Sequence, residues 1–477
     1  MINFEYIPSR RLCRVTGDKF DEIREHFSVK NKNAFFMKRF GRNFVNSRIY
    51  CITPTGLFEP GMFYEILRYI KTTYTEDIVY DDKIKQVIKP ALASTESPYD
   101  NLSLKLRDYQ LETVTEAIKY GRGIIKVGTG GGKTLTIASL ISTYYTFNKK
   151  LKTLLIVPDL TLVDQTYKDF LSYKVPFNPT RWTGNIEPDL SANVIIANIG
   201  ILQSRFQEVP WLVDIDVLVV DECHKLKKGN KVCKLINQIK TNHKFGLTGT
   251  LPDDKVDEWN IIGKLGSVFY EKSSFDLRAE NYLVNADIKI LQIKYNSKPA
   301  PVPGVNDFRT ELDFIYKNTY RNDVIKSICG KCNNNILILV NHLVHGDTLL
   351  KHLTSLQNKE VYFIKGEVEV EERAKVIKKM EESNNVVCIA ISAIFSTGVN
   401  IKNLHTIIFA SGGKSFIRTI QSIGRGLRLN QNKEKLTIID IADKLEYSAA
   451  HSIRRKEIYI QEKFQFKDIE VVEKQLS

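Results

Sequence analysis

Short apolar runs alternate with helical patterns from about residue 103 onward, and this alternation limits the fold more than any other feature. Neighbouring parallel strands need a long crossover connection, which is usually a helix. The apolar runs before residue 250 are 123–127, 154–157, 194–197, 217–220 and 245–248. A second series follows at 336–340, 361–364, 386–390, 406–409 and 436–440. The sequence therefore predicts an α/β fold with two tandem parallel-sheet lobes.

We predict three domains along the chain. Residues 1–97 precede the alternating pattern and are expected to form a small N-terminal α+β accessory domain that binds nucleic acid. Proline and serine recur in residues 90–103, as in linkers. The first lobe is predicted at 98–282 and the second at 283–477. A turn-rich segment, 296–304, is interpreted as an exposed loop near the boundary between the lobes.

The charge of the chain indicates the class of its partner. The 477 residues carry a formal net charge of +14, which favours a polyanion. No run of about 18 uncharged apolar residues is present, so we expect no membrane span. The first residues lack the basic start and apolar core of a secretion signal. Seven scattered cysteines then indicate reduced thiols and a cytoplasmic protein.

Basic residues are concentrated near the N-terminus, where no acidic residue lies between Glu25 and Glu59. This stretch contains Lys30, Lys32, Lys38, Arg39, Arg42 and Arg48, interleaved with Phe35, Phe36, Phe40 and Phe44. Basic groups neutralise phosphates, and exposed aromatic rings can stack on bases. We interpret the charges as nucleic-acid contacts. We interpret the phenylalanines as the core of the small domain, because most aromatic residues are buried.

A glycine-rich turn joins the 123–127 run to a helical pattern over 134–145. Such a turn exposes consecutive backbone N–H groups, and the helix dipole adds positive potential at the same point. The residues that we expect to bind the nucleotide here are Gly128, Thr129, Gly130, Gly131, Gly132, Lys133 and Thr134. We predict that Lys133 reaches the β- and γ-phosphates of ATP and that Thr134 binds Mg²⁺. Val127 departs from the general motif, which has glycine at that position.

Two acidic residues, Asp221 and Glu222, follow the apolar run 217–220. A carboxylate at the end of a buried strand beside a phosphate loop can hold the hydration shell of Mg²⁺, and we assign this role to Asp221. Glu222 is then placed to polarise the attacking water. The pair predicts the catalytic centre of an ATPase, together with Lys133.

A third segment, 421–428, carries Gln421, Arg425 and Arg428. On a helix, two arginines three residues apart lie on one face. Their planar donors suit the negative charge that develops on the γ-phosphate in the transition state. We predict catalytic roles for both arginines and for Gln421, whose amide can orient water or the γ-phosphate.

Together these segments resemble the motifs of the superfamily 2 helicases with a DExH-type box, over about residues 103–445. Further likeness to the motifs of that superfamily lies at 106–110, 157–165, 197–198, 247–250 and 396–400. The resemblance implies two RecA-like lobes and ATP hydrolysis with Mg²⁺. It also implies that Gln110 binds the adenine edge, with support from Arg107. Asn400 departs from the family, which often has aspartate there.

Within the superfamily, the chain most resembles the phage UvsW-type branch-migration helicases, in its size, its basic N-terminal region and its C-terminal pattern 443–459. The resemblance implies an ATP-dependent helicase or translocase on forked and junction DNA, in replication, recombination or repair. It also implies a monomer in the cytoplasm, of a host cell if the chain is phage-encoded, with recombination or replication proteins as candidate partners. Three alternatives stay open: an RNA helicase, an ATP-switched clamp, and a restriction-type DNA translocase subunit.

Overall fold

The computed structural model describes residues 1–31, 34, 46–90, 97–205, 209–301, 303–365, 370–392, 401, 403–411 and 435–473. The predicted site residues Gln421, Arg425 and Arg428 lie outside the described residues, as do 396–400 and most of the predicted N-terminal basic cluster. Residue contacts divide the chain into two units, Met1–Val127 with Gly132–Lys272, and Gly128–Gly131 with Ser273–Ser477. Within the described ranges, no helix is long and apolar enough to cross a membrane.

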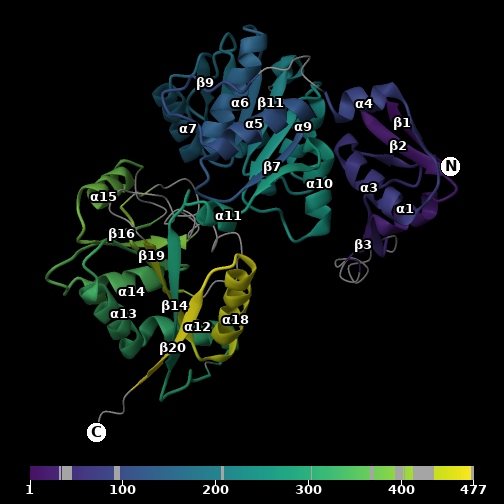
Figure 1. Cartoon of the computed structure of the whole chain (residues 1–477). Helices are drawn as coiled ribbons and strands as arrows, with labels where there is room; N and C mark the ends of the chain where they lie inside the picture. The colour runs from purple at the N-terminus through teal and green to yellow at the C-terminus, as the bar shows by residue number, and fades with distance from the viewer. Residues whose placement is uncertain are drawn as a thin grey trace. The chain divides into compact units, whose positions relative to one another are not determined.

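The N-terminal region of the first unit is a small α+β structure (Figure 1). Its four-stranded mixed sheet has the order β5-β2-β1-β6. The strands are β1 (Ile2–Ile7), β2 (Leu12–Gly17), β5 (Leu57–Phe58) and β6 (Ile78–Tyr80). The helices are α1 (Phe20–His26), α3 (Phe63–Thr73) and α4 (Asp82–Ile88), and β3 (Ser28–Lys30) pairs with β4 (Arg48–Tyr50). Burial alternates along β1 and β2, so one face of the small sheet is its core face.

The N-terminal region and the adjoining parallel sheet share one apolar core. Buried residues of the small sheet, such as Phe4 and Val15, belong to the same cluster as Ile262 in helix α10 (Lys255–Leu265). The backbone at Gly61 approaches α10 so closely that an added Cβ would lie 1.9 Å from the Ile262 carbonyl oxygen. The two parts of this unit are therefore packed as one body, which the sequence did not indicate.

The larger sheet of the first unit has seven parallel strands in the order β13-β7-β12-β11-β8-β10-β9. They are β7 (Gly123–Val127), β8 (Thr153–Val157), β9 (Pro179–Trp182), β10 (Val194–Asn198), β11 (Val217–Asp221), β12 (Lys244–Thr248) and β13 (Val268–Lys272). The helices around it are α5 (Asp108–Tyr120), α6 (Lys133–Phe147), α7 (Leu160–Tyr173), α8 (Ile199–Ser204), α9 (Lys231–Gln238) and α10 (Figure 1). Because helices cover both faces, β8 is buried throughout and β11 at every residue but its last.

The second unit is built on another seven-stranded parallel sheet, in the order β16-β17-β15-β18-β19-β14-β20. Its strands are β14 (Asn285–Lys294), β15 (Ile336–Val340), β16 (Glu360–Ile364), β17 (Val386–Ile391), β18 (Thr406–Phe409), β19 (Lys435–Asp443) and β20 (Phe466–Val472). Its helices include α11 (Ser274–Ala279), α12 (Asp307–Lys317), α13 (Thr319–Lys331), α14 (Leu343–Leu353), α15 (Val370–Glu382) and α18 (Glu446–Gln461) (Figure 1).

The predicted fold class is confirmed: two parallel sheets with helices follow a small mixed sheet. Every apolar run that was predicted as a strand lies in a strand of one of the two large sheets. The sequence did not predict β9, β13, β14 or β20. The predicted lobe boundary after residue 282 lies between α11 and β14, inside the second contact unit, so the domain division stays a prediction.

Candidate ATP site

The predicted phosphate loop joins β7 to α6 at the carboxyl edge of the first parallel sheet. Gly130 and Gly132 have φ angles of +89° and +70°, in the left-handed region that favours glycine. The Gly131 N–H donates to the Gly128 carbonyl at 3.0 Å and closes a tight turn. Because α6 begins at Lys133, the turn leads directly into the positive end of a helix dipole. This backbone has the conformation that anion-binding strand–turn–helix segments share.

Close packing leaves no room for a side chain at two of these glycines. A Cβ at Gly128 would lie 2.4 Å from Oγ of Ser274, the first residue of α11, a helix that was not predicted from the sequence. A Cβ at Gly132 would lie 2.6 Å from Nε2 of Gln110. Gln110 donates to the Gly132 carbonyl at 3.2 Å, and its Oε1 accepts from the Arg107 N–H at 2.9 Å. Gln110 thus lies beside the phosphate loop, and its contact with adenine stays a prediction.

Lys133 forms an ion pair with Glu222, which brings two of the predicted catalytic residues together. The distance from Lys133 Nζ to Glu222 Oε1 is 3.4 Å, and the two side chains are only 10% and 18% exposed. Asp221 is the last residue of β11, and Glu222 follows it with a φ of +48°. A left-handed glutamate is strained, and strain of this kind is concentrated at functional sites.

The two adjacent carboxylates differ in acidity. Burial, and then the charge of Glu222, raise the pKa of Asp221 to about 7. Burial also disfavours the ionised form of Glu222, but Lys133 and His224 outweigh it and lower the pKa of Glu222. Two largely buried carboxylates therefore face one largely buried ammonium group, and a divalent cation would compensate the remaining negative charge. Carboxylate and hydroxyl oxygens, as at Asp221 and Thr134, are the ligands that Mg²⁺ prefers.

His224 connects the acidic pair to the neighbouring strand. Its Nδ1 lies 3.3 Å from Glu222 Oε2 and 2.9 Å from the Thr248 hydroxyl oxygen. Thr248 is the last residue of β12, which pairs with β11, and its hydroxyl donates to the Thr250 carbonyl at 2.7 Å. The predicted motif 247–250 therefore contacts the DExH-type box through one buried imidazole ring. The sequence predicted both motifs, but it did not predict the contact between His224 and Thr248 that joins them.

Two further predicted motifs cap helices at the same edge of the sheet. Asp159 follows β8 and accepts from the Leu162 N–H at 3.1 Å. Asn198 ends β10 and accepts from the Ile201 N–H at 2.7 Å. The carboxyl ends of β7, β8, β10, β11 and β12 share one edge, where ligands of open parallel sheets bind. The contacts of these motifs with nucleic acid stay a prediction.

The remaining predicted site residues are placed less fully. Thr134 is the second residue of α6 and is partly exposed, and Thr129 is buried in the loop. Gln421, Arg425 and Arg428 are outside the described residues, so the structure does not test their roles. The described side chains are suited to phosphate binding, metal binding and water activation.

Comparison with known families gives two matches that contain the segments of the site. Residues 103–253 match the family described as Type III restriction enzyme, res subunit. Residues 320–430 match the helicase conserved C-terminal domain. The chain is a superfamily 2 helicase. As a member of that superfamily, this helicase hydrolyses ATP.

Two relatives and one solved structure show how far the similarity to this helicase extends. The ATP-dependent DNA helicase uvsW of Enterobacteria phage T4 is 26% identical over 478 residues, which cover 94% of each chain. The DNA 3'-5' translocase XPB2 of Sulfurisphaera tokodaii is 23% identical over 79% of this chain and 92% of its own. Saccharomyces cerevisiae Dbp5, solved bound to RNA and ADP BeF3, aligns with a TM-score of 0.56 at 16% identity, over 77% of this chain and 90% of its own. The last likeness shows the fold alone.

Proposed function

We propose that the protein is an ATP-dependent DNA helicase that unwinds or branch-migrates forked and junction DNA in replication, recombination or repair. The similarity to the T4 uvsW helicase supports this substrate, because it covers 94% of both chains and so includes most of the N-terminal region. The net charge of +14 supports a polyanionic substrate independently.

The observation that carries the ATPase chemistry is the buried ion pair of Lys133 and Glu222 at the carboxyl edge of the sheet. ATP binding would exchange this pair for contact between the ammonium group and the β- and γ-phosphates. Glu222, released from the lysine, would accept a hydrogen bond from the attacking water. Mg²⁺, held by Asp221 and Thr134, would neutralise charge on the phosphate oxygens.

Arg425 and Arg428 complete the proposed chemistry. Their guanidinium groups would stabilise the charge on the γ-phosphate in the transition state, and Gln421 would orient the water or that phosphate. An arginine in this role raises the rate of hydrolysis by a factor of roughly 10³–10⁵. Gln110 and Arg107 would bind the adenine, since Gln110 already lies beside the phosphate loop.

DNA would be held mainly through its phosphates. Contacts from 157–165, 197–198 and 396–400 would fix the strand without reading its bases. We therefore expect little sequence preference and a strong dependence of affinity on salt. The N-terminal region would hold duplex or branched DNA. We propose a monomer in the cytoplasm, of a host cell if the chain is phage-encoded, which acts with recombination or replication proteins.

The proposed function is tested by measuring ATP turnover and strand separation on single-stranded, duplex, forked and four-way DNA, with matched RNA substrates. We expect the greatest stimulation by forked and four-way DNA. Stimulation by RNA and not by DNA would contradict the proposal. DNA-stimulated turnover without displacement of a triplex-forming strand would indicate an ATP-switched clamp instead.

A further inference from the structure

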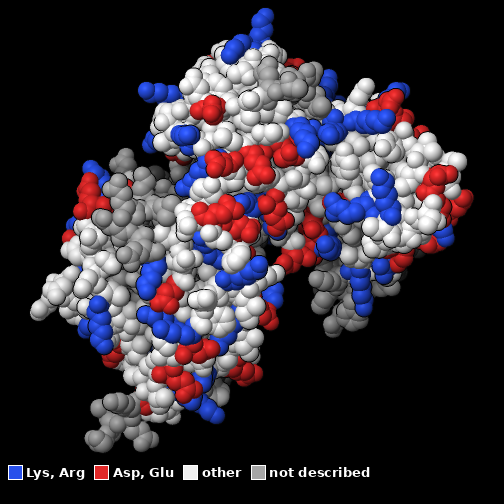
Figure 2. Space-filling view, in the orientation of Figure 1, with Lys and Arg blue, Asp and Glu red and all other residues white. Residues whose placement is uncertain are grey.

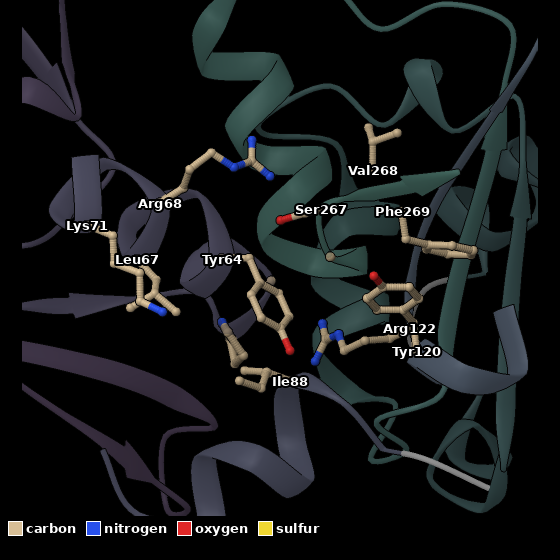
Figure 3. A pocket seen from close by; sticks show the side chains of 13 residues that line it. Tyr64, Leu67, Arg68, Lys71, Ile88, Tyr120, Arg122, Ser267, Val268 and Phe269 are labelled. Carbon is tan, nitrogen blue, oxygen red and sulfur yellow. The ribbon is translucent and has the colours of Figure 1, made fainter. Parts of the chain in front are cut away.

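A pocket of about 440 Å³ lies within the first unit, where the N-terminal region packs against the parallel sheet (Figure 3). Helix α3 contributes Tyr64, Leu67, Arg68 and Lys71 to its wall. The opposite wall is formed by Tyr120 and Arg122, before β7, and by residues 266–269, at the start of β13. A volume of this size is within the range of small-molecule sites.

This pocket is separate from the ATP site. Tyr120 and Arg122 precede β7, whereas the phosphate loop follows the carboxyl end of that strand. A strand of this length spans roughly 16 Å. The pocket therefore adjoins the amino end of β7, and a ligand bound in it would not occupy the nucleotide site.

The wall of the pocket is basic. Arg68, Lys71 and Arg122 line it, and none of the described residues in its lining is acidic. Lys71 is exposed and forms no ion pair with any residue that the structure describes. Arg68 pairs with Glu65 at 3.4 Å, but its side chain is 65% exposed, so water screens the pair. Figure 2 shows Lys and Arg side chains over the surface around α3. An anion would be attracted to this wall.

Arg122 adds a buried positive charge to the wall. Its guanidinium group donates to the carbonyls of Val87, Lys264 and Leu265 at 3.0, 3.0 and 3.2 Å, which joins the N-terminal region to α10. Burial lowers the pKa of Arg122 to about 10. The nearby carboxylate of Glu59 is engaged by Lys264 Nζ at 3.0 Å. The acceptors described for Arg122 are therefore neutral carbonyls, which take three of its five N–H groups, and its charge is offset only through space, by groups such as Glu59.

Hydroxyl groups and aromatic rings complete the pocket. Figure 3 shows the hydroxyl end of Tyr64 directed toward the guanidinium group of Arg122. Tyr120 stacks on Phe269, with ring centroids 5.4 Å apart and an interplanar angle of 22°. The Oγ of Ser267 is buried and has no hydrogen-bond partner in the described part of the chain. A phosphate would accept from such hydroxyl and cationic donors, and the half-buried ring of Tyr64 offers a surface for a sugar or a base.

We propose that this pocket binds a phosphate-bearing nucleotide, with the phosphate held by Arg68 and Lys71 and the nucleoside against Tyr64 and Leu67. The nucleotide could come from a DNA strand or from the free nucleotide pool, since both present the same chemistry. The possibility that the nucleotide belongs to a DNA strand rests on the proposed function. In that case the pocket gives the N-terminal region a contact with an unpaired nucleotide, beside its contacts with duplex.

The first test compares two matched lysines. Lys71 on α3 and Lys83 on α4 are both exposed, and neither forms an ion pair with a described residue. We expect Lys71→Gln to lower the slope of log affinity against log salt by about 0.7, the value for one lost phosphate contact on single-stranded DNA. Lys83→Gln should leave that slope unchanged. Fluorescence anisotropy of a labelled oligonucleotide measures both. Equal slopes for wild type and both variants would overturn a DNA phosphate contact at Lys71.

The second test locates the nucleotide directly. An oligonucleotide containing 5-iodouracil should cross-link to Tyr64 on irradiation, as mapped by mass spectrometry, and Tyr64→Leu should lose the adduct. For the free-nucleotide source, calorimetric binding of dAMP should depend on Lys71 and not on Lys83. Either result supports nucleotide binding in the pocket and shows whether the nucleotide comes from a DNA strand or from the free pool.

The pocket and the proposed function fail in distinguishable ways. No adduct at Tyr64, no dependence of dAMP binding on Lys71 and an unchanged salt slope would overturn the pocket, while DNA-stimulated ATPase activity would continue to support the helicase. A chain that binds no DNA would refute the proposed function. The dAMP measurement would still show whether the pocket binds a nucleotide. Thermal unfolding of Lys71→Gln and Tyr64→Leu should match wild type, which excludes misfolding as the cause of lost binding.

Discussion

The two parallel sheets each carry a cluster of buried charge, and the two clusters are balanced differently. At the carboxyl edge of the first sheet, one ammonium group, Lys133, faces the carboxylates of Asp221 and Glu222. The pKa of Asp221 is raised by burial, and Glu222 has a strained backbone. This cluster lacks the positive charge that its carboxylates need.

In the second unit, two of the described buried arginines each have a carboxylate partner of matching geometry. Arg321 donates to both oxygens of Asp443, from Nε at 2.8 Å and from Nη2 at 3.2 Å. Arg455 likewise donates to both oxygens of Asp440, from Nε at 2.9 Å and from Nη2 at 2.7 Å. The Tyr459 hydroxyl donates to the same carboxylate at 2.8 Å. Charges that are matched in this way hold a fold together, whereas an unbalanced cluster is typical of a ligand site. Substitutions in the first cluster should therefore affect turnover, and those in the second should affect stability.

The largest effect is expected at Lys133. Lys133→Ala removes the ammonium group that pairs with Glu222 and that we expect on the phosphates, so ATP hydrolysis should be abolished. DNA affinity should stay near wild type, because we expect this side chain to contact ATP and not DNA. A coupled-enzyme assay measures ATP turnover, and fluorescence anisotropy of labelled DNA measures DNA affinity. Near wild-type turnover would refute the assignment of the site.

A slightly smaller loss is expected at Arg425. Arg425→Ala should lower ATP turnover by roughly 10³–10⁵ while ATP still binds, because the guanidinium acts on charge that exists only in the transition state. Binding of a fluorescent ATP analogue separates the two steps. Loss of ATP affinity together with a lower unfolding midpoint would make Arg425 a structural residue.

The matched cluster should respond through stability. Asp443→Asn leaves the guanidinium of Arg321 buried without its charge partner, which should lower the free energy of unfolding by about 3–5 kcal/mol. Asp287→Asn is the control, because its pair with Lys289 is half-exposed and spans 3.7 Å. Urea unfolding of both variants measures the difference. Equal stability of Asp443→Asn and wild type would contradict the contrast between the two clusters.

The sequence predicted most of the fold because the central strands are buried on both faces. Runs such as 217–220 and 386–390 are then uniformly apolar and easily recognised. β14 and β20 were missed because they carry charged residues and are half-exposed, as strands near a sheet edge are. β20 (Phe466–Val472) is the edge strand of the second sheet.

The residues of the candidate site could be predicted where they form local motifs, but their contacts could not. The strand–turn–helix at 128–134 and the acidic pair at 221–222 are continuous in the sequence. The bond from Gln110 to Gly132 and that from His224 to Thr248 depend on how strands and helices pack. The same holds for the core shared by the N-terminal region and α10, so removal of residues 1–95 would expose apolar surface rather than delete an independent domain.

A moderate effect is expected at His224, which joins the unbalanced cluster to Thr248. His224→Ala should reduce the stimulation of ATP turnover by DNA about tenfold, because coupling free energies between sites are typically 1–3 kcal/mol. Basal turnover should fall less. Thr248→Val should have a similar effect, and the double variant should be no worse than either single one, since both remove the same contact. Additive losses would show that the two residues act independently of each other.

The smallest effect is expected at a charged cluster on the surface of the second unit. Glu470 on β20 pairs with Lys294 and Lys444 at 2.9 and 2.6 Å, and these bonds lower its pKa to about 2. A carboxylate whose folded-state pKa is lowered stabilises the fold above its ordinary pKa of 4.5, and this contribution is lost as the pH falls toward 2. Wild type should therefore be slightly more stable than Glu470→Gln at pH 7, and the difference should shrink below pH 4.5. High salt should shrink it as well, because the group is exposed. Urea midpoints measured across pH test this, and a difference that is constant from pH 7 to pH 3 would show that Glu470 stabilises β20 by packing rather than by charge.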